Sequence, residues 1–543
     1  MDQHQSNISM RKRVADLINI CSDGLYEREE IVAVSLLSAI AGQPVFLYGL
    51  PGTAKSLIAR RLSKVFKDTS HFEYLMQNFS TPEDVFGPVS IQELKKDNYV
   101  RKTDGYLPAA DFAFLDEIWK SSPAILNTLL TIINERIYRN NGKAEKVPLK
   151  ALIAASNEIP PPNQGLEALY DRFVMRIVVD PMHERENFER LLDGGPVPID
   201  VVVPDRLQFS HAEWERIPDE IYKVGISREV FAIINSIRVS IDEFNRDNPE
   251  TAVYVSDRRW QRIAFILKAS ALLCDRTEVI PVDTFILRHC LWTLEENREQ
   301  IDGIVVRAVK QFGCANHEKL NSWLLDHTGI ENDVFDTFFY PEDVYDTTEI
   351  SGKQYFPITS PEIEKDPNGH SPVKIKVRFY VPVEKMGTYD PFTPVDENGD
   401  LQLRLECNFN GTRLCEVKIQ EKLLKSGWDY PIKSNSYVEW FEATLPVKFK
   451  RGAQKNVSPG VRYAFEDACK RSLMALEEIT SNTVHYVDAQ RKLNETPFVP
   501  VEKREMLLDS FEAFLKDLEN HRLNAEHLLE KVQSHAVPES GNC

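Results

Sequence analysis

The sequence predicts an α/β protein: a phosphate-loop core with a helical lid, followed by a β-rich module inserted in a C-terminal helical domain. From Val45 to about Val179, short apolar runs alternate with helical patterns, which is typical of a doubly wound parallel sheet. A glycine-containing loop, Gly49 to Ser56, lies between an apolar strand and a helix. After Tyr340 the pattern changes to alternating strands separated by clusters of Pro, Gly, Asp and Asn.

A chain of 543 residues is too long for one hydrophobic core, so we expect three or four domains. The predicted division is a core over 1–203, a lid over 204–312, a discontinuous helical domain over 313–340 and 455–535, and a β-rich partner-binding module over 341–454.

Charge and cysteine usage limit the function classes. The net charge of −18 argues against broad, nonspecific binding to nucleic acid, although it leaves room for a local basic stripe or pore loop. The eight cysteines show no Cys-x-x-Cys spacing, which favours a reducing compartment over a disulfide framework or a zinc site. The polar segment Met1 to Ile20 lacks a signal-peptide core, so we expect a cytoplasmic protein without a transmembrane segment.

The predicted core contains an uncharged stretch, Ile31 to Leu50, that is long enough to span a bilayer. Gln43 and Pro44 interrupt it, so a buried helix from Glu30 to Ala41, a turn and a buried strand explain it better. We expect mostly parallel strands with the ligand at their carboxyl ends. These strands are Val45 to Tyr48, Phe72 to Met76, Phe112 to Leu115, Leu149 to Ala155 and Val174 to Val179.

A helical domain is expected between about Pro204 and Phe312, and a short helix from His317 to Leu325 should follow it. The predicted helices of this domain include Val230 to Phe244, Arg258 to Cys274 and Thr284 to Glu296.

The last third of the chain combines an antiparallel sheet or small barrel with two long amphipathic helices, Val461 to Arg491 and Lys503 to Val532. These helices pack within the chain or form a coiled coil, and packing within the chain is the preferred interpretation. The predicted strands are Val373 to Val381, Leu401 to Phe409, Cys415 to Ile419 and Tyr437 to Phe449.

The loop after the first strand has the character of a phosphate-binding loop, whose successive N–H groups face a triphosphate at a helix N-terminus. Lys55 would reach the outer phosphates, and Ser56 would hold Mg²⁺. Ala54 stands where the general pattern has glycine, and we expect its methyl group to be tolerated because the helix starts there. The predicted nucleotide-binding residues of the loop are Gly49, Leu50, Pro51, Gly52, Thr53, Ala54, Lys55, Ser56 and Leu57.

Polar side chains follow two further strands of the predicted sheet. Asp116 and Glu117 end the strand that starts at Phe112, where Asp116 would bind Mg²⁺ through its water shell and Glu117 would polarise the attacking water. Asn157 follows the strand that ends at Ala155 and could hold the same water beside the γ-phosphate. Taken alone, Asn157 would be an ordinary loop residue.

Two arginines complete the predicted catalytic set. Arg172 could project toward the γ-phosphate bound by a neighbouring subunit, and Arg258 could reach the nucleotide from the helical domain. For both, a surface ion pair is the alternative, and the adjacent Arg259 competes with Arg258 for the role.

The ordered set of motifs resembles the MoxR family of AAA+ ATPases. Besides the phosphate loop, Asp116-Glu117-Ile118 and Ser156-Asn157, the set comprises Ser80 to Pro88, Gly105 to Pro108, Asn127 to Arg136 and Asp171-Arg172-Phe173. Three segments are most similar to the subgroup called regulatory ATPase variant A, which shares the alanine at position 54: Gly24 to Arg28, Ala54 to Leu62 and Val255 to Trp260.

The resemblance implies a Mg²⁺-dependent, ATP-hydrolysing AAA+ core with a helical lid over residues 10 to 310, assembled as a hexamer with nucleotide at the subunit interfaces. It implies that Arg172 is the trans-acting finger, that Arg258 is the second sensor, and that 137–150 forms a hairpin. The Asn141-Gly142 turn supports the hairpin independently. For the β-rich module it suggests docking onto an inducible lysine decarboxylase, and it implies a von Willebrand A-domain partner protein and chaperone-like action on a client.

Two other readings remain. One is a nucleotide-gated binding scaffold with little turnover, which would use the same binding residues; the intact Glu117 and Arg172 favour hydrolysis over it. The other is the ATPase subunit of a metal-inserting chelatase, against which the β-rich module and the long C-terminal helices argue. Helicase or nuclease action has little support, because the chain is acidic and lacks a basic stretch interleaved with aromatics.

Overall fold

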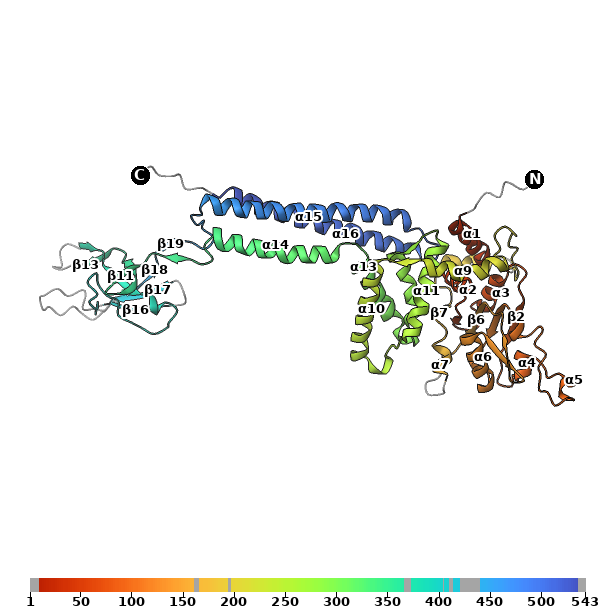
Figure 1. The fold of residues 1–543 in the computed structure, drawn as a ribbon. Coiled ribbons are helices and arrows are strands. Elements are labelled where there is room, and N and C mark those ends of the chain that lie inside the picture. Colours follow the sequence, from red (N-terminus) through yellow and green to blue (C-terminus); the bar gives the residue numbers. More distant parts are fainter. Residues whose placement is uncertain are drawn as a thin grey trace, which may run out of the picture. The chain divides into compact units, whose positions relative to one another are not determined.

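The computed structural model describes residues 9–160, 166–193, 197–365, 373–403, 405–409, 414–419 and 440–535 (Figure 1). Contacts divide the chain into two compact units, Met1–Lys319 with Glu478–Glu519, and Leu320–Glu477 with Asn520–Cys543. Each unit is described by itself. The four-part division into core, lid, helical domain and β-rich module stays a prediction.

The first unit is built on a five-stranded sheet with the strand order β2-β3-β6-β1-β7, in which every neighbouring pair is parallel. All five predicted strands are present, with ends that differ by two residues at most, because strands buried on both faces read as continuous apolar runs. The strands are β1 Val45–Tyr48, β2 His71–Leu75, β3 Phe112–Asp116, β6 Ala151–Ser156 and β7 Met175–Val178.

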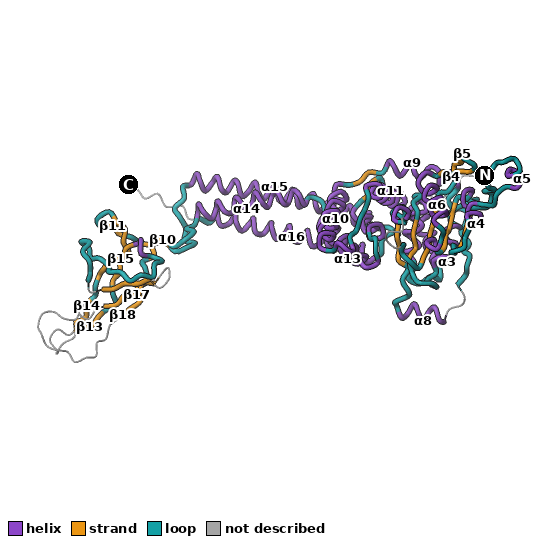
Figure 2. The backbone as a smooth tube through the Cα atoms, turned by 90° about the horizontal axis from the view of Figure 1, so that it is seen from below, coloured by secondary structure: helices purple, strands orange, loops and turns teal. Residues whose placement is uncertain are grey.

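Helices cover both faces of this sheet (Figure 2). Phe46, Leu115 and Ala154 pack on one face against apolar residues of α6 (Pro123–Glu135). On the other side, α2 (Glu29–Ile40) contacts β6 and α3 contacts β3. The remaining helices of this part are α1 Met10–Ser22, α3 Lys55–Ser63, α4 Pro82–Phe86, α5 Ile91–Leu94, α7 Glu167–Tyr170 and α8 Arg185–Asp193, with 3₁₀ turns η1 Leu107–Ala109 and η2 Ile118–Lys120.

The expected hairpin precedes β6. Strands β4 (Ile137–Asn140) and β5 (Lys143–Lys146) pair antiparallel across Asn141 and Gly142, both of which have positive φ angles, of 51° and 77°. Positive φ at both central residues is what a two-residue turn of the favoured hand requires, so the Asn-Gly signal is confirmed.

The helical segment after the core contains most of the predicted helices, but the expected helix from Thr284 to Glu296 is wrong. The chain instead forms the 3₁₀ helix η4 and the one-turn α12, and Trp292 is extended with φ −66° and ψ 152°. The helix cannot continue there because the carbonyl groups of Cys290 and Trp292 accept hydrogen bonds from buried arginines. The elements are α9 His211–Lys223, β8 Gly225–Ile226, α10 Arg228–Asp247, η3 Pro249–Thr251, α11 Asp257–Leu273, β9 Glu278–Val279, η4 Pro281–Leu287, α12 Arg288–Leu291, η5 Glu295–Asn297 and α13 Arg298–Phe312.

A buried ion pair stabilises this segment. Asp283 is fully buried and binds Arg276 through two hydrogen bonds of 2.6 and 2.8 Å, and it also accepts from the Ser270 hydroxyl at 2.7 Å. Removing one partner of such a pair leaves a buried, unpaired charge. Asp283→Ala is therefore expected to lower the free energy of unfolding of this unit by about 3–5 kcal/mol.

Denaturant unfolding followed by Trp fluorescence measures this change. The double variant Arg276→Met/Asp283→Leu is the matched control, because it removes both charges and should recover most of the loss. A double variant as unstable as Asp283→Ala would contradict the electrostatic explanation.

Three long helices follow: α14 His317–Phe338, α15 Pro459–Leu493 and α16 Val501–Gln533. The predicted short helix, His317 to Leu325, is too short by 13 residues, because buried residues continue along α14 as far as Val334 and Phe338. In the second unit these two residues form a cluster with Cys469 of α15 and with Leu528 and Val532 of α16. The two later helices thus pack within the chain, as preferred from the sequence.

The second unit also contains short antiparallel strands between α14 and α15. Two predicted strands are interrupted: 373–381 breaks at 376–377, and 437–449 breaks around Leu445 and Pro446, with 437–439 outside the described residues. Of the predicted strand 401–409, residue 404 is not described and 405–409 is a strand. The strands are β10 Val344–Tyr345, β11 Thr348–Ile350, β12 Lys353–Thr359, β13 Ile363–Lys365, β14 Val373–Ile375, β15 Arg378–Pro382, β16 Leu405–Phe409, β17 Leu414–Ile419, β18 Trp440–Thr444 and β19 Val447–Phe449, with the 3₁₀ turn η6 Val383–Lys385.

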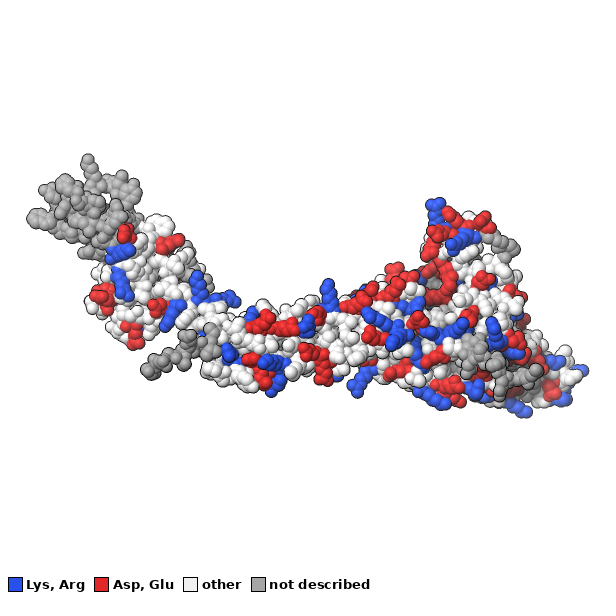
Figure 3. All heavy atoms as spheres, turned by 90° about the horizontal axis from the view of Figure 1, so that it is seen from above, with Lys and Arg blue, Asp and Glu red and all other residues white. Residues whose placement is uncertain are grey.

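Acidic and basic side chains are interspersed on the face drawn in Figure 3. Among the helices that the structure describes, none combines the length and the apolar character needed to cross a bilayer.

Candidate nucleotide-binding site

The phosphate loop follows the carboxyl end of β1 and leads directly into α3. Gly49 allows the loop to pass close to β7, since a Cβ atom there would collide with the Val179 carbonyl oxygen. Ala54 is the N-cap of α3 and has φ 71° and ψ 19°, in the left-handed region. The position precedes the helix and is left-handed, and a side chain there costs about 1–2 kcal/mol. The sequence did not indicate this cost.

Lys55 lies at the centre of the loop. Its ammonium group donates to the carbonyl oxygens of Gly49 at 2.6 Å and Leu50 at 2.9 Å, and the residue is only 7% exposed. Burial lowers the pKa of Lys55, and the nearby carboxylates of Asp116 and Glu117 oppose this shift. Both predicted acidic residues thus lie within electrostatic reach of the lysine.

Ser56 and Asp116 come together from different elements. The Ser56 hydroxyl, in the first turn of α3, donates to Asp116 Oδ2 at 3.0 Å, and Asp116 Oδ1 accepts from the Glu117 amide at 3.0 Å. A hydroxyl group and a carboxylate are hard oxygen donors of the kind that Mg²⁺ prefers. The two predicted metal residues are thus adjacent and have suitable chemistry.

Glu117 and Asn157 occupy neighbouring strand ends at the same edge of the sheet. Glu117 has φ 51° and ψ 44°, a left-handed conformation that is unfavourable for glutamate and of a kind concentrated at functional sites. Its Oε2 atom is buried without a hydrogen bond and lies 3.3 Å from the Lys120 ammonium. The Oδ1 atom of Asn157 is also buried and has no hydrogen-bond partner among the described residues. A buried polar atom without a hydrogen bond is costly, so both oxygens are suited to accepting a hydrogen bond from a water molecule or a ligand.

A cavity of about 380 Å³ opens at the carboxyl end of β7, and sequence reasoning did not predict it. Val178, at the end of β7, lines it, and the next residue, Val179, is hydrogen-bonded to Tyr48 at 2.7 Å. Its charged lining includes Arg28 and Glu30. Burial alone would raise the pKa of Glu30, but hydrogen bonds and charges from His289 and Arg288 outweigh it and hold the pKa at about 2.

The two predicted catalytic arginines lie at the opposite edge of the sheet. Arg172 precedes β7, and both Arg172 and Arg258 donate to Asn134 Oδ1, at 2.5 and 3.0 Å. Asn134 is in the last turn of α6. Arg136, the C-cap of the same helix, donates a hydrogen bond to the carbonyl oxygen of Gly42, which precedes β1. The structure thus brings Arg172 and Arg258 together, but it brings neither to the phosphate loop of its own chain. The expectation that Arg258 reaches the nucleotide from the helical domain stays a prediction.

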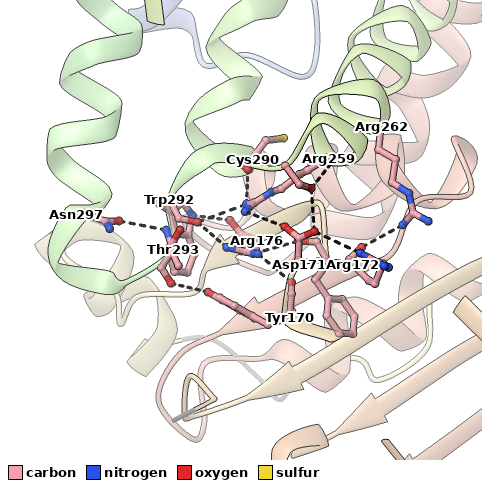
Figure 4. A network of polar contacts seen from close by, with 12 residues as sticks. Tyr170, Asp171, Arg172, Arg176, Arg259, Arg262, Cys290, Trp292, Thr293 and Asn297 are labelled. Carbon is pink, nitrogen blue, oxygen red and sulfur yellow. Dashed lines mark hydrogen bonds and ion pairs between the residues drawn. The ribbon is translucent and has the colours of Figure 1, made fainter. Parts of the chain in front are cut away.

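Arg259, the rival of Arg258, belongs to a buried network (Figure 4). It is 1% exposed, donates to the Cys290 carbonyl oxygen, and lies 3.9 Å from Asp171. Burial, and then the charge of Arg176, lowers its pKa to about 9. Its guanidinium group joins the helical segment to the core, whereas Arg258 is exposed. The geometry therefore favours Arg258 over Arg259 for contact with a ligand.

Two residues of this region had no role predicted from the sequence. Asn134 lies in a segment used for the family resemblance, but nothing marks its side chain as a shared acceptor. Lys120 contacts Glu117, and its spacing of three residues along the chain was a signal that could have been used.

Two family profiles match this chain, and a solved structure aligns with it. A family profile described as the MoxR domain in the MoxR-vWA-beta-propeller ternary systems matches residues 12–201, and an AAA lid domain profile matches residues 229–305. A crystal structure of a presumed ATPase from Cytophaga hutchinsonii aligns with a TM-score of 0.43 at 20% identity, covering 55% of this chain and 94% of that one.

Three curated proteins are similar in sequence. The uncharacterized proteins MJ0079 and MJ0812 of Methanocaldococcus jannaschii are each 36% identical, over 53% and 54% of this chain and 71% and 73% of their own lengths. The structural protein ORF618 of Acidianus two-tailed virus is 25% identical, over 51% of this chain and 48% of its own length. The family profiles and the extent of these matches show that the chain belongs to the MoxR family of AAA+ ATPases.

Proposed function

We propose that this protein hydrolyses ATP to ADP and phosphate in a Mg²⁺-dependent reaction, within a ring of identical subunits. The observation that carries the proposal is the convergence of Lys55, the Ser56–Asp116 pair, Glu117 and Asn157 at the carboxyl edge of one parallel sheet. Open α/β sheets bind their ligands at this edge.

Each group fits a part of the substrate. The backbone N–H groups of the phosphate loop and the Lys55 ammonium suit the phosphates, and the cavity beside β7 has room for the rest of the nucleotide. Ser56 and Asp116 would hold Mg²⁺, which neutralises charge on the phosphates when bound.

The proposed reaction is an in-line attack of water on the γ-phosphorus. The water oxygen forms the new bond to phosphorus, and the bond to the oxygen that bridges the β- and γ-phosphates breaks. Glu117 accepts a proton from the water, Asn157 orients it, and Lys55 stabilises charge on the transferred group.

The opposite edge supports a site shared between subunits. Arg172 and Arg258 lie too far from the phosphate loop of their own chain to contact a ligand there. The length of β1 separates Gly42, near the arginines, from Gly49 in that loop. In a closed ring, which we propose to be a hexamer, they would face the nucleotide of the neighbouring subunit. Such arginines stabilise the charge of the transition state.

The concentration dependence of phosphate release tests this proposal. If the site is shared, the rate per subunit should rise steeply with protein concentration at low concentration and level off when rings are complete. The matched measurement is fluorescent-nucleotide binding over the same range. A rate per subunit that stays constant down to concentrations at which sedimentation shows monomers would contradict the shared site. Absence of any phosphate release would favour the nucleotide-gated scaffold.

For cellular role, we propose chaperone-like remodelling of a protein client together with a von Willebrand A-domain partner. The support for the partner is the description of the matched family, which names MoxR-vWA-beta-propeller systems. Membership of the regulatory ATPase variant A subgroup is proposed from the sequence motifs. A lysine decarboxylase client is proposed from the likeness of architecture after residue 310, and a cytoplasmic location from the cysteine pattern. The family profiles end at residue 305, before the strands proposed to dock a client.

A further inference from the structure

One amide oxygen holds two arginines that come from distant parts of the chain. Asn134 Oδ1 accepts from Arg172 Nε at 2.5 Å and from Arg258 Nη2 at 3.0 Å. Arg172 precedes β7, and Arg258 lies in the first turn of α11. A single atom of α6 thus fixes the spacing of two guanidinium groups that no other hydrogen bond among the described residues joins.

The surroundings of this pair are rich in positive charge. Arg262 donates to the Arg172 carbonyl oxygen (Figure 4). Arg136 is close enough for its charge to affect Arg262. Burial, followed by the charges of Arg258, Arg172 and Arg136, lowers the pKa of Arg262 to about 10. Within the described part of the chain, no carboxylate lies within 4 Å of Arg136, Arg258 or Arg262.

The acid nearest to Arg172 is Asp171, which is only partly available to it. Asp171 Oδ2 lies 3.3 Å from Arg172 Nη1 and also accepts from the Ser256 hydroxyl at 3.0 Å, while its Oδ1 faces Arg259. The cluster therefore carries more positive than negative charge, and an anion from outside the subunit would relieve the repulsion. Arg136, Arg258 and Arg262 line a cavity of about 670 Å³, which provides room for such an anion.

We propose that Asn134 is a positioning residue, whose uncharged amide oxygen holds Arg172 and Arg258 side by side for the phosphates bound by the neighbouring subunit. This inference rests on the shared site of the proposed function. An amide is suited to the task because it accepts hydrogen bonds from both guanidinium groups without neutralising them. A carboxylate at the same place would bind the arginines more tightly and cancel part of their charge.

Asn134→Asp and Asn134→Ala test this role separately from folding. Both should lower the turnover number at least about tenfold, Asn134→Ala because the arginines are misplaced and Asn134→Asp because the carboxylate cancels part of their charge. Neither should change the dissociation constant for ATP, since the phosphate loop lies at the other edge of the sheet. Asn235→Asp, on the exposed side of α10, makes the same chemical change away from the site and should have no effect.

Mixed rings show whether the defect acts across the interface. Asn134→Asp keeps an intact phosphate loop, and Glu117→Gln keeps intact arginines, so their mixture should hydrolyse ATP several-fold faster than either variant alone. Asn134→Asp mixed with Arg172→Ala should show no such gain, because both variants lack the same half of the site. Asn134→Ala should behave like Asn134→Asp in both mixtures.

A reference mixture of Arg172→Ala with Glu117→Gln distinguishes failure of the Asn134 role from failure of the shared site. If Arg172→Ala recovers activity with Glu117→Gln but neither Asn134 variant does, the role of Asn134 is refuted while the shared site stands. If Arg172→Ala also fails to recover, the shared site of the proposed function is refuted, and the inference falls with it. Recovery in the mixture of Asn134→Asp with Arg172→Ala would also overturn the inference.

Discussion

Replacing Glu117 with glutamine is expected to lower steady-state phosphate release by about 10²- to 10⁴-fold while ATP binding stays close to that of the wild type. The carboxylate is the proposed proton acceptor for water, and glutamine has nearly the same shape but cannot accept a proton. The side chain is held at the end of β3 in a left-handed backbone conformation, with one buried oxygen that makes no hydrogen bond. Loss of this group should therefore affect the reaction and not the assembly of the site.

Phosphate release at saturating ATP and equilibrium binding of a fluorescent nucleotide measure the two properties separately. Glu220→Gln, at an exposed position of α9, is the matched control for the change in net charge and should retain wild-type activity. Wild-type turnover in Glu117→Gln would refute the assignment of the base.

Replacing Lys55 with alanine is expected to weaken ATP binding at least about 100-fold and to abolish measurable hydrolysis. Its ammonium group is the buried cation of the phosphate loop, and hydrogen bonds to charged groups contribute about 1.5–3 kcal/mol each. Two such bonds to phosphate oxygens account for the expected loss of affinity.

Thermal unfolding with and without ATP provides an independent readout, because a ligand that binds only the folded state raises the unfolding midpoint. The midpoint should rise with ATP in the wild type and stay unchanged in Lys55→Ala. Lys64→Ala is the matched control, since Lys64 is exposed at the C-cap of the same helix. A normal ATP-dependent rise in Lys55→Ala would contradict the proposed site.

The phosphate-binding edge of the core could be predicted from the sequence because its signals are local. Each predicted residue there stands at the end of an apolar run, and parallel strands place their carboxyl ends at one edge. The hairpin turn at Asn141 and Gly142 was equally local. The left-handed backbone of Ala54 could not be predicted, since the same residue reads as an ordinary helix start until its φ angle is known.

The features that the sequence did not reveal depend on contacts between distant residues. Asn134 and Arg258 are 124 positions apart, and no periodic pattern connects them. The helix expected from Thr284 to Glu296 fails because the carbonyl groups of Cys290 and Trp292 are bound by Arg259 and Arg176 from elsewhere in the chain. Local helix propensity cannot anticipate such tertiary competition.

The carbonyl oxygens of Gly49 and Leu50 compete with any ligand for the Lys55 ammonium group, because both accept hydrogen bonds from it. A ligand gains only the difference between its own interactions with the ammonium group and those of the two carbonyl oxygens that it replaces. A ligand with weak acceptors gains almost nothing from the exchange, whereas a triphosphate offers charged oxygens and a net gain. In the proposed site, the loop would thus set a threshold for entry and would favour highly charged ligands before any contact with the base or ribose is made.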